Sequence, residues 1–248
     1  MKNTEKITSK PNNQSLLAAV MSAALVLASG LSLQAARQPQ IAPPGTAPYG
    51  KTYGEWAVAW WQWAFSIPAV NNPVLDSTGQ YAAVGQSGPV WFLGSTFGGS
   101  ERRSETIPGG KAIFLPVYQW IFGATVGDCD PSNPGVVCDV PTLQAAAAAP
   151  TLAVREMEVE IDGKAVARIR DYRATSPGAF AVVLPDDNVP EVFGLPTPAG
   201  TYATQVADGY WLMLAPLSAG KHVINVRVVP DSNYGSSYAV KYNLIVTQ

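Results

Sequence analysis

Nine short apolar runs, separated by Gly, Pro, Asp and Asn, occupy this 248-residue chain from Val90 to its end. Runs of this length bounded by turn-forming residues are typical of strands in antiparallel sandwiches and jelly rolls. The last run alternates most clearly, because Tyr238, Val240 and Tyr242 share one side of a strand while Lys241 lies on the other. The sequence therefore predicts a mainly β fold, an antiparallel β-sandwich or jelly roll.

Two Asp-Gly pairs, Asp162-Gly163 and Asp208-Gly209, each stand between alternating apolar runs. Asp-Gly suits the type I′ turn, whose two central residues both need a positive φ. We therefore expect a tight hairpin at each pair.

Residues 51–68 depart from the strand pattern and indicate one helix. Thr52 and Glu55 have the T-x-x-E spacing of a capping box, and Pro68 marks the end of the helical pattern. Three tryptophans recur at helical spacing, namely Trp56, Trp60 and Trp63. A helix so apolar around its circumference must be buried on most sides. We expect it to pack on a sheet of the sandwich.

The first 36 residues have the layout of a secretory signal, because three lysines precede an uncharged run with an apolar centre from Leu16 to Leu33. Ala28-Ser29-Gly30 fits the small-x-small cleavage rule better than Gln34-Ala35-Ala36 does. An uncleaved anchor is the alternative, since about 18 apolar residues are near the lower limit for crossing a bilayer. The predicted protein is secreted or periplasmic. Its predicted segments are a signal (1–36), a Pro-rich linker (37–49) and a single domain (50–248).

The composition of the chain excludes several classes of binding and catalytic site. The 16 Lys and Arg against 18 Asp and Glu form no basic block, which argues against nucleic acid as a partner. One histidine, His222, and two cysteines are too few for an ordinary zinc site, and no Gly-rich phosphate loop is present. We expect no metal, no cofactor and no membrane contact beyond the N-terminal segment.

The two cysteines, Cys129 and Cys138, lie nine positions apart. Exported proteins form disulfides, so we expect a structural bridge that closes a small loop. The same loop carries oxygen donors of the kind that calcium binds, at Asp128, Asp130, Asn133 and Asp139. Their spacing does not match an EF-hand, so solvated acidic residues are the favoured interpretation and calcium is the alternative.

Several strings along the chain resemble a family of exported bacterial proteins: YGEWAVAWWQWAFSIP, NPVLDSTG, GQSGPVWFLGSTFGG, IPGGKAIFLPV, ADGYWLMLAPLSAGKHVI and YNLIV. They cover most of the chain from Tyr49 to Val246. The resemblance implies export and a single domain. It implies no activity, cofactor or catalytic residue, so function has to be argued from the residues.

The tryptophans suggest a carbohydrate site, because flat aromatic rings offer an apolar face and a polar edge. Trp61 and Trp211 are less constrained by core packing than the others, and Trp211 is the better candidate for an exposed ring because it follows an expected turn. Stacking on these rings, with hydrogen bonds from Gln62, Gln86 or Asp208, predicts a non-catalytic binding module for a saccharide or cell-wall polymer.

A carboxylate pair would instead support a metal-independent polysaccharide hydrolase or lyase. The candidates are Glu55, Asp76, Asp171 and Asp208. Each has a structural alternative: the capping box, the turn Asp76-Ser77-Thr78-Gly79, a pairing of Asp171 with Arg170 or Arg173, and the second hairpin. A structural coat component is the third interpretation.

Two further groups could carry chemistry. His222 shares a strand face with Ile224 and Val226, which favours a partly buried histidine over a general base. Arg102 and Arg103 could bind an anion as a fork, or belong to an exposed mixed-charge loop.

Overall fold

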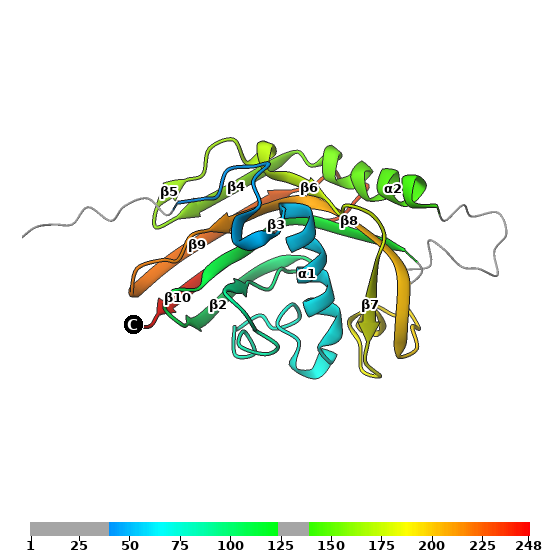
Figure 1. The fold of residues 1–248 in the computed structure, drawn as a ribbon, viewed down its shortest axis with the longest axis horizontal. Helices are drawn as coiled ribbons and strands as arrows, with labels where there is room; N and C mark the ends of the chain where they lie inside the picture. Colours follow the sequence, from blue (N-terminus) through cyan, green and yellow to red (C-terminus); the bar gives the residue numbers. More distant parts are fainter. Residues whose placement is uncertain (1–39, 124–138) are drawn as a thin grey trace, which may run out of the picture. The chain divides into compact units, whose positions relative to one another are not determined.

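The computed structural model describes residues 40–123 and 139–248, which form ten strands in two five-stranded sheets (Figure 1). In the first sheet the order is β1 (Val90–Phe92), β3 (Ala112–Gly123), β8 (Gly200–Leu214) and β6 (Arg173–Thr175), and β7 (Phe180–Leu184) also pairs with β8. In the second sheet the order is β2 (Gly99–Ile107), β10 (Tyr238–Val246), β9 (Gly220–Val229), β4 (Glu156–Ile161) and β5 (Lys164–Ala165). The predicted signal segment and the Cys129–Cys138 loop lie outside the described residues.

The predicted mainly β sandwich is confirmed, with one difference in strand direction. Most pairings are antiparallel, but β1 pairs with β3 and β2 pairs with β10 in parallel. Both sheets are therefore mixed.

Alternate residues of β3 and β8 serve two cores, which gives three layers. On one face Leu115 and Leu212 pack against the second sheet, where they meet Ile224 and Tyr242. On the other face Phe114, Trp211 and Met213 pack against helix α1 (Tyr53–Ser66). Period-two alternation thus places the first sheet between the second sheet and the helix.

Helix α1 begins and ends where the sequence predicts. The Thr52 hydroxyl accepts a hydrogen bond from the Glu55 amide at 3.3 Å, and the Glu55 carboxylate accepts one from the Thr52 amide at 2.7 Å. Trp56, Trp60 and Trp63 are all buried, so the helix packs as its apolar surface requires.

Only one of the two hairpins predicted at Asp-Gly pairs is present in the structure. Asp162 and Gly163 have φ of 51° and 74° and join β4 to β5, which confirms a type I′ hairpin. The second hairpin is wrong, because Asp208 and Gly209 lie inside the continuous 15-residue strand β8. A Cβ added to Gly209 would lie 2.7 Å from the Tyr118 carbonyl oxygen of β3, so glycine permits a close approach of backbones here.

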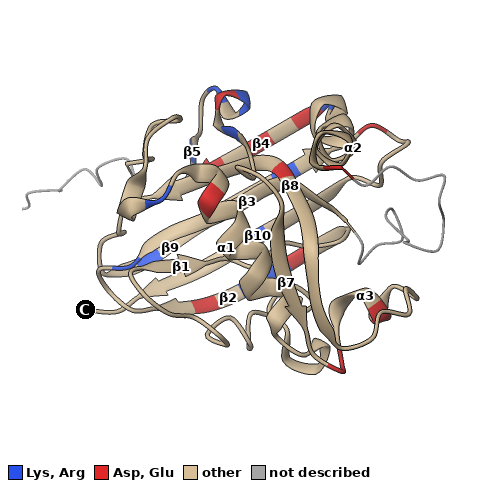
Figure 2. Cartoon of the chain, turned by 45° about the vertical axis from the view of Figure 1, so that its right-hand side comes forward, with Lys and Arg blue, Asp and Glu red and all other residues tan. Residues whose placement is uncertain are grey.

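The remaining helices are α2 (Val140–Ala153) and α3 (Val189–Val192). The Asp139 carboxylate caps α2 by accepting a hydrogen bond from the Thr142 amide at 2.8 Å. Helix α2 contacts β3 and β8, whereas the short α3 follows β7. Among the described helices, none combines the length and the apolar character that spanning a bilayer requires. Most of the ribbon in Figure 2 carries no charged residue, but β2 carries Glu101, Arg102, Arg103 and Glu105, and β4 carries Glu156, Glu158 and Glu160.

Candidate functional site

A pocket of about 300 Å³, which we call the aromatic pocket, opens where the end of β3 meets α1, α3 and the loop between β9 and β10. Eight aromatic side chains line it: Trp61, Phe65, Phe97, Tyr118, Trp120, Phe193, Tyr234 and Tyr238. Aliphatic side chains complete much of the wall, including Ile121, Val189 and Leu195. The volume is at the lower end of the range for small-molecule sites and suits one ring-sized unit.

The aromatic rings of the pocket belong to three groups in mutual contact. On the α1 wall, the rings of Trp61 and Phe65 lie 5.2 Å apart, centroid to centroid, edge to face. On the opposite side, Trp120 of β3 lies 6.3 Å from Tyr234, also edge to face. The third group is the pair Phe97 and Phe193, whose ring centroids lie 4.5 Å apart. These contacts fix the ring orientations, so the walls are formed before any ligand arrives.

Two buried polar atoms on the pocket's lining residues, Trp61 Nε1 and Gln119 Oε1, lack a hydrogen-bond partner. A hydrogen bond from Trp120 lowers the pKa of the Tyr118 hydroxyl, but burial has the larger effect and raises it. Buried polar groups are nearly always paired in folded proteins, and an unpaired one is costly. Both atoms are closed off from solvent, so the surface that the pocket presents to a ligand is its aromatic and aliphatic lining.

The described lining of the aromatic pocket contains no Asp, Glu, Lys, Arg or His. A charged ligand would lose its hydration there without gaining a counter-charge. The pocket therefore suits an uncharged ligand, and it offers no carboxylate for acid–base chemistry.

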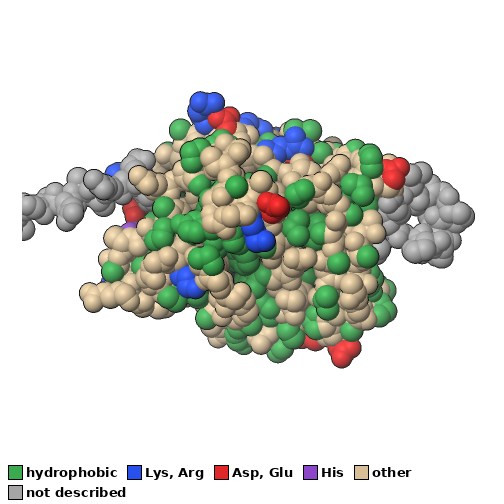
Figure 3. Space-filling view, viewed as in Figure 1, with side chains coloured by type: hydrophobic (Ala, Val, Ile, Leu, Met, Phe, Trp, Pro, Cys, Tyr) green, Lys and Arg blue, Asp and Glu red, His purple; other side chains and the backbone are tan. Residues whose placement is uncertain are grey.

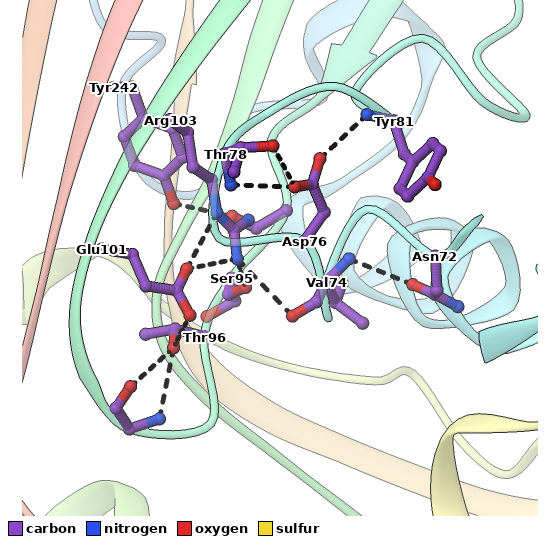
Figure 4. Close-up of polar contacts among 12 residues, drawn as sticks. Asn72, Val74, Asp76, Thr78, Tyr81, Ser95, Thr96, Glu101, Arg103 and Tyr242 are labelled. Carbon is purple, nitrogen blue, oxygen red and sulfur yellow. Dashed lines mark hydrogen bonds and ion pairs between the residues drawn. The ribbon is translucent and has the colours of Figure 1, made fainter. Parts of the chain in front are cut away.

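A charged cluster lies beside the pocket rather than in it (Figure 4). Thr96, which lines the pocket, donates a hydrogen bond to Glu101 at 2.7 Å. Arg103 is only 1% exposed and donates to Glu101 at 2.6 Å and to the Ser95 carbonyl at 2.7 Å. This buried ion pair on β2 holds the Thr96 segment in place at the pocket wall.

Two other carboxyl groups flank Arg103. Burial alone would raise the pKa of Asp76, but hydrogen bonds from Thr78 and the Tyr81 amide hold it below its usual value. Glu105 shows the opposite balance, because burial raises its pKa to about 7 despite a hydrogen bond from Trp91 and the charge of Arg103.

The five predicted binding residues do not form one site. Trp61 lines the aromatic pocket, although it is only 4% exposed. The prediction that Trp211 is exposed is wrong, because it is fully buried and stacks on Phe114 under α1. Gln62 lies on the exposed side of α1 and donates to the Ala181 carbonyl, whereas Gln86 binds the Phe92 backbone.

Asp208 is also a structural residue. It is fully buried, and its carboxylate accepts two hydrogen bonds from Arg173, at 2.9 and 2.8 Å, and one from Thr175 at 2.6 Å. These bonds join β6 to β8 and explain why an aspartate stands in the middle of a strand.

The other predicted carboxylates have structural partners too. Glu55 caps α1, and Asp76 closes its predicted turn by binding Thr78. Asp171 pairs with Arg168 at 2.6 Å, so the predicted pairing with Arg170 or Arg173 is wrong. Three pockets in the described part of the chain are lined around Trp120, around Val166 and around Glu55, and only the last includes any of the four candidates, Glu55 alone.

The remaining candidates likewise serve the fold. His222 is partly buried on the β9 face that carries Ile224, and it bonds Asp162 at 2.7 Å and the Ser218 carbonyl at 2.9 Å. Arg102 and Arg103 lie on β2 rather than in a loop, and Arg103 faces inward. Within residues 40–123 and 139–248, no group of three or more His, Cys, Asp or Glu could hold a metal ion. Most of the predicted calcium ligands fall outside those ranges.

Sequence reasoning missed the β3 part of the site: Tyr118, Gln119 and Trp120. The signal that could have indicated it is a period-two aromatic series, Tyr118, Trp120 and Phe122, at the end of a strand. Aromatic residues that cluster on one face near a strand end are typical of a binding surface as well as of a core.

No protein-family model matches this chain, and comparisons with curated proteins and with solved structures also find no match. The resemblance to a family of exported proteins therefore stays a prediction, and the function has to be argued from the pocket.

Proposed function

We propose that this protein is an exported, non-catalytic binding module that holds an uncharged saccharide unit of a cell-envelope polymer in the aromatic pocket. The observation that carries this proposal is the aromatic pocket itself, whose described lining has eight aromatic side chains and no charged one. The signal-like layout of residues 1–36 supports a secreted or periplasmic location.

A saccharide ring fits this combination of surfaces. Its axial C–H bonds pack against aromatic faces, and its hydroxyls hydrogen-bond at the ring edge. Trp61 and Trp120 supply apolar ring surface to the lining, and Gln119 adds a polar side chain. Catalysis is not part of the proposal, because the pocket's described lining holds no acid–base pair.

The test is a titration of the full-length protein with neutral oligosaccharides. Calorimetry measures the binding affinity, and the indole N–H signals in NMR spectra show which tryptophans respond to the ligand. We expect the Trp61 and Trp120 signals to shift, and Trp120→Ala to weaken binding at least about tenfold, the loss typical of one aromatic stacking contact. Tyr49→Ala is the matched control, because Tyr49 is 44% exposed and does not line the pocket.

Near-ultraviolet circular dichroism would show that both variants keep the native fold. Binding that survives Trp120→Ala unchanged, or no response to any neutral oligosaccharide, would overturn the proposal.

A further inference from the structure

The first sheet has an open edge beside the end of β3. β1 pairs with β3 only as far as Phe114, and from there to Gly123 the only described strand that pairs with β3 is β8. We infer that the aromatic pocket is a vacant strand position at this edge, and that it binds an extended, uncharged peptide segment which adds a strand to β3. This inference goes beyond the proposed function, because it assigns the pocket a second class of ligand.

The lining shows that the pocket lies beside β3 rather than over one of its faces. It includes four consecutive residues of the strand, Tyr118, Gln119, Trp120 and Ile121. Successive side chains of a strand point to opposite faces of the sheet, so a pocket over one face would be lined by alternate residues only. A pocket lined by four residues in a row follows the edge of the strand.

The other walls come from the layers on either side of the first sheet. Trp61 and Phe65 belong to α1, which packs on one face of that sheet. Tyr238 begins β10 of the second sheet, and Tyr234 lies in the loop before it. A strand in the pocket would therefore direct its side chains alternately toward α1 and toward the second sheet, as β3 itself does.

The backbone groups of Gln119 and Ile121 point to this open edge. Ala207, opposite Ile121, forms its backbone hydrogen bonds on the far side of β8: its carbonyl accepts from the Ser176 amide at 2.8 Å, and its amide donates to the Ser176 hydroxyl at 3.1 Å. Ile121 and Ala207 are therefore a non-hydrogen-bonded pair, in which each residue turns its N–H and C=O away from the other strand. Gln119 lies two residues earlier and has the same orientation.

One carbonyl at this edge already has a side-chain partner from the pocket wall. The Tyr238 hydroxyl donates a hydrogen bond to the Val117 carbonyl at 2.6 Å. Within residues 40–123 and 139–248, no backbone group outside the β3–β8 pairing bonds the N–H or C=O of Gln119 or Ile121. Two donors and two acceptors, repeated about 7 Å apart along the edge, therefore remain for a ligand. This is the pattern that an added strand satisfies.

The lining also determines which peptide fits. Aromatic and aliphatic side chains form the walls, and a charged side chain would lose its hydration there without gaining a counter-charge. A proline whose nitrogen faced β3 would remove a donor from the ladder. We therefore expect a segment of about three consecutive apolar residues without proline, since each residue of a strand extends about 3.3 Å.

The first experiment measures amide hydrogen exchange by NMR in the isotope-labelled full-length protein. The probe is a capped peptide with the central sequence Val-Phe-Val between Gly-Ser linkers. Without the peptide, the Gln119 and Ile121 amides should exchange faster than the Trp120 amide, which faces β8. With the peptide, their exchange should slow at least about tenfold. Equal rates for all three amides in the free protein, or no slowing on binding, would overturn the inference.

Two methylated peptides distinguish strand pairing from simple filling of the pocket. Each carries one methyl group, on one or the other of two adjacent backbone nitrogens in the central sequence. Only one of two adjacent N–H groups in a strand can face β3, so one peptide should bind at least about tenfold more weakly than the other. Equal affinities in calorimetric titrations would show that the backbone of the ligand does not pair with β3.

Gln119→Pro and Gln119→Ala form a matched pair on the protein side. Both remove the amide side chain, but only proline removes the backbone N–H, and proline is tolerated where a strand edge has no partner. We expect Gln119→Pro to bind the unmodified peptide at least about tenfold more weakly than Gln119→Ala does. Equal affinities of two variants with native circular dichroism would contradict the inference. If Gln119→Pro does not fold, the methylated peptides decide the question.

Peptide and saccharide binding are measured in separate titrations, so the two proposals can fail independently. If the unmodified peptide does not bind, this inference fails and the saccharide proposal stands. If the peptide binds and no neutral oligosaccharide does, the proposed function fails and the strand-addition site stands.

Discussion

Glu105 is a buried carboxyl group on β2 whose pKa burial raises to about 7. The groups that act on it are Trp91, which donates a hydrogen bond, and Arg103, Asp76 and Tyr242 through their charges or dipoles. In the unfolded chain this carboxyl titrates near its ordinary value of 4.5. Between these two pKa values the folded protein binds one more proton than the unfolded chain does.

We therefore predict that Glu105 lowers stability as the pH rises from about 4.5 to about 7. Glu105→Gln should remove this pH dependence, because the amide is neutral and can still accept from Trp91. Relative to wild type, the variant should be more stable at pH 8 by on the order of 3 kcal/mol, and nearly equal at pH 4. Urea unfolding at both pH values measures the difference, and an equal effect at both would contradict the prediction.

Asp208 gives a second prediction at the residue scale. Asp208→Asn keeps the shape of the side chain but removes the charge that pairs with Arg173. Because Asp208 is fully buried while Arg173 is 32% exposed, we expect a loss of about 2 kcal/mol in the free energy of unfolding.

Saccharide binding should be unchanged in Asp208→Asn, since Asp208 does not line the aromatic pocket. Asp171→Asn is the control, because the Arg168–Asp171 pair is exposed and contributes little to stability. Loss of binding without loss of stability in Asp208→Asn would show that the residue has a functional role.

At the scale of the elements, two segments meet across the mouth of the aromatic pocket. Phe97, in the loop between β1 and β2, and Phe193, just after α3, have ring centroids 4.5 Å apart and are about half exposed, at 53% and 49%. Gly98 and Gly194 follow them with φ of 148° and 74°, and a Cβ added to either would meet nothing within 4 Å. No neighbouring atoms therefore pack against either segment at its glycine. Few charged side chains surround the hydrophobic ones on the face seen in Figure 3.

We predict that the contact between these two rings limits access of water to the pocket. Phe193→Ala should speed hydrogen exchange of the unpaired Trp61 indole N–H group, measured by NMR. The Trp60 indole N–H, which bonds the Leu93 carbonyl at 2.9 Å, should keep its exchange rate.

Val192→Ala is the matched control, because Val192 is the preceding residue, is 55% exposed and does not line the pocket. Unchanged exchange in Phe193→Ala, or equal acceleration in both variants, would contradict the prediction. This measurement needs no ligand, so its result is independent of the saccharide proposal.

Elements with local signals could be predicted from the sequence. The capping box of Thr52 and Glu55 determines the start of α1, and Asp162-Gly163 determines a hairpin, because each depends on neighbouring residues only. Asp208-Gly209 carries the same local signal, yet tertiary contacts override it. Arg173 binds the aspartate from β6, and the backbone of β3 approaches the glycine.

At the scale of the whole molecule, the strand pattern predicts a sandwich but not which strands become neighbours. The parallel pairing of β2 with β10 joins segments far apart in the sequence, and nothing in either segment alone indicates it. The candidate site likewise depends on which distant residues the fold brings together. Trp61 could be proposed from its ring alone, but Gln119 becomes a candidate only when the fold shows that its carbonyl lacks a partner.

The pairing of β2 with β10 also determines when, during synthesis and folding, the second sheet can be completed. Gly99 pairs with Tyr238 and Ile107 with Val246, and among the strands that the structure describes β10 is the only neighbour of β2. Pairings between such distant segments form slowly, because a long stretch of chain must close before any contact is gained. During synthesis β2 leaves the ribosome long before its partner does. The second sheet can therefore be completed only when almost the whole chain has been made, and until then the β2 backbone lacks its partner strand.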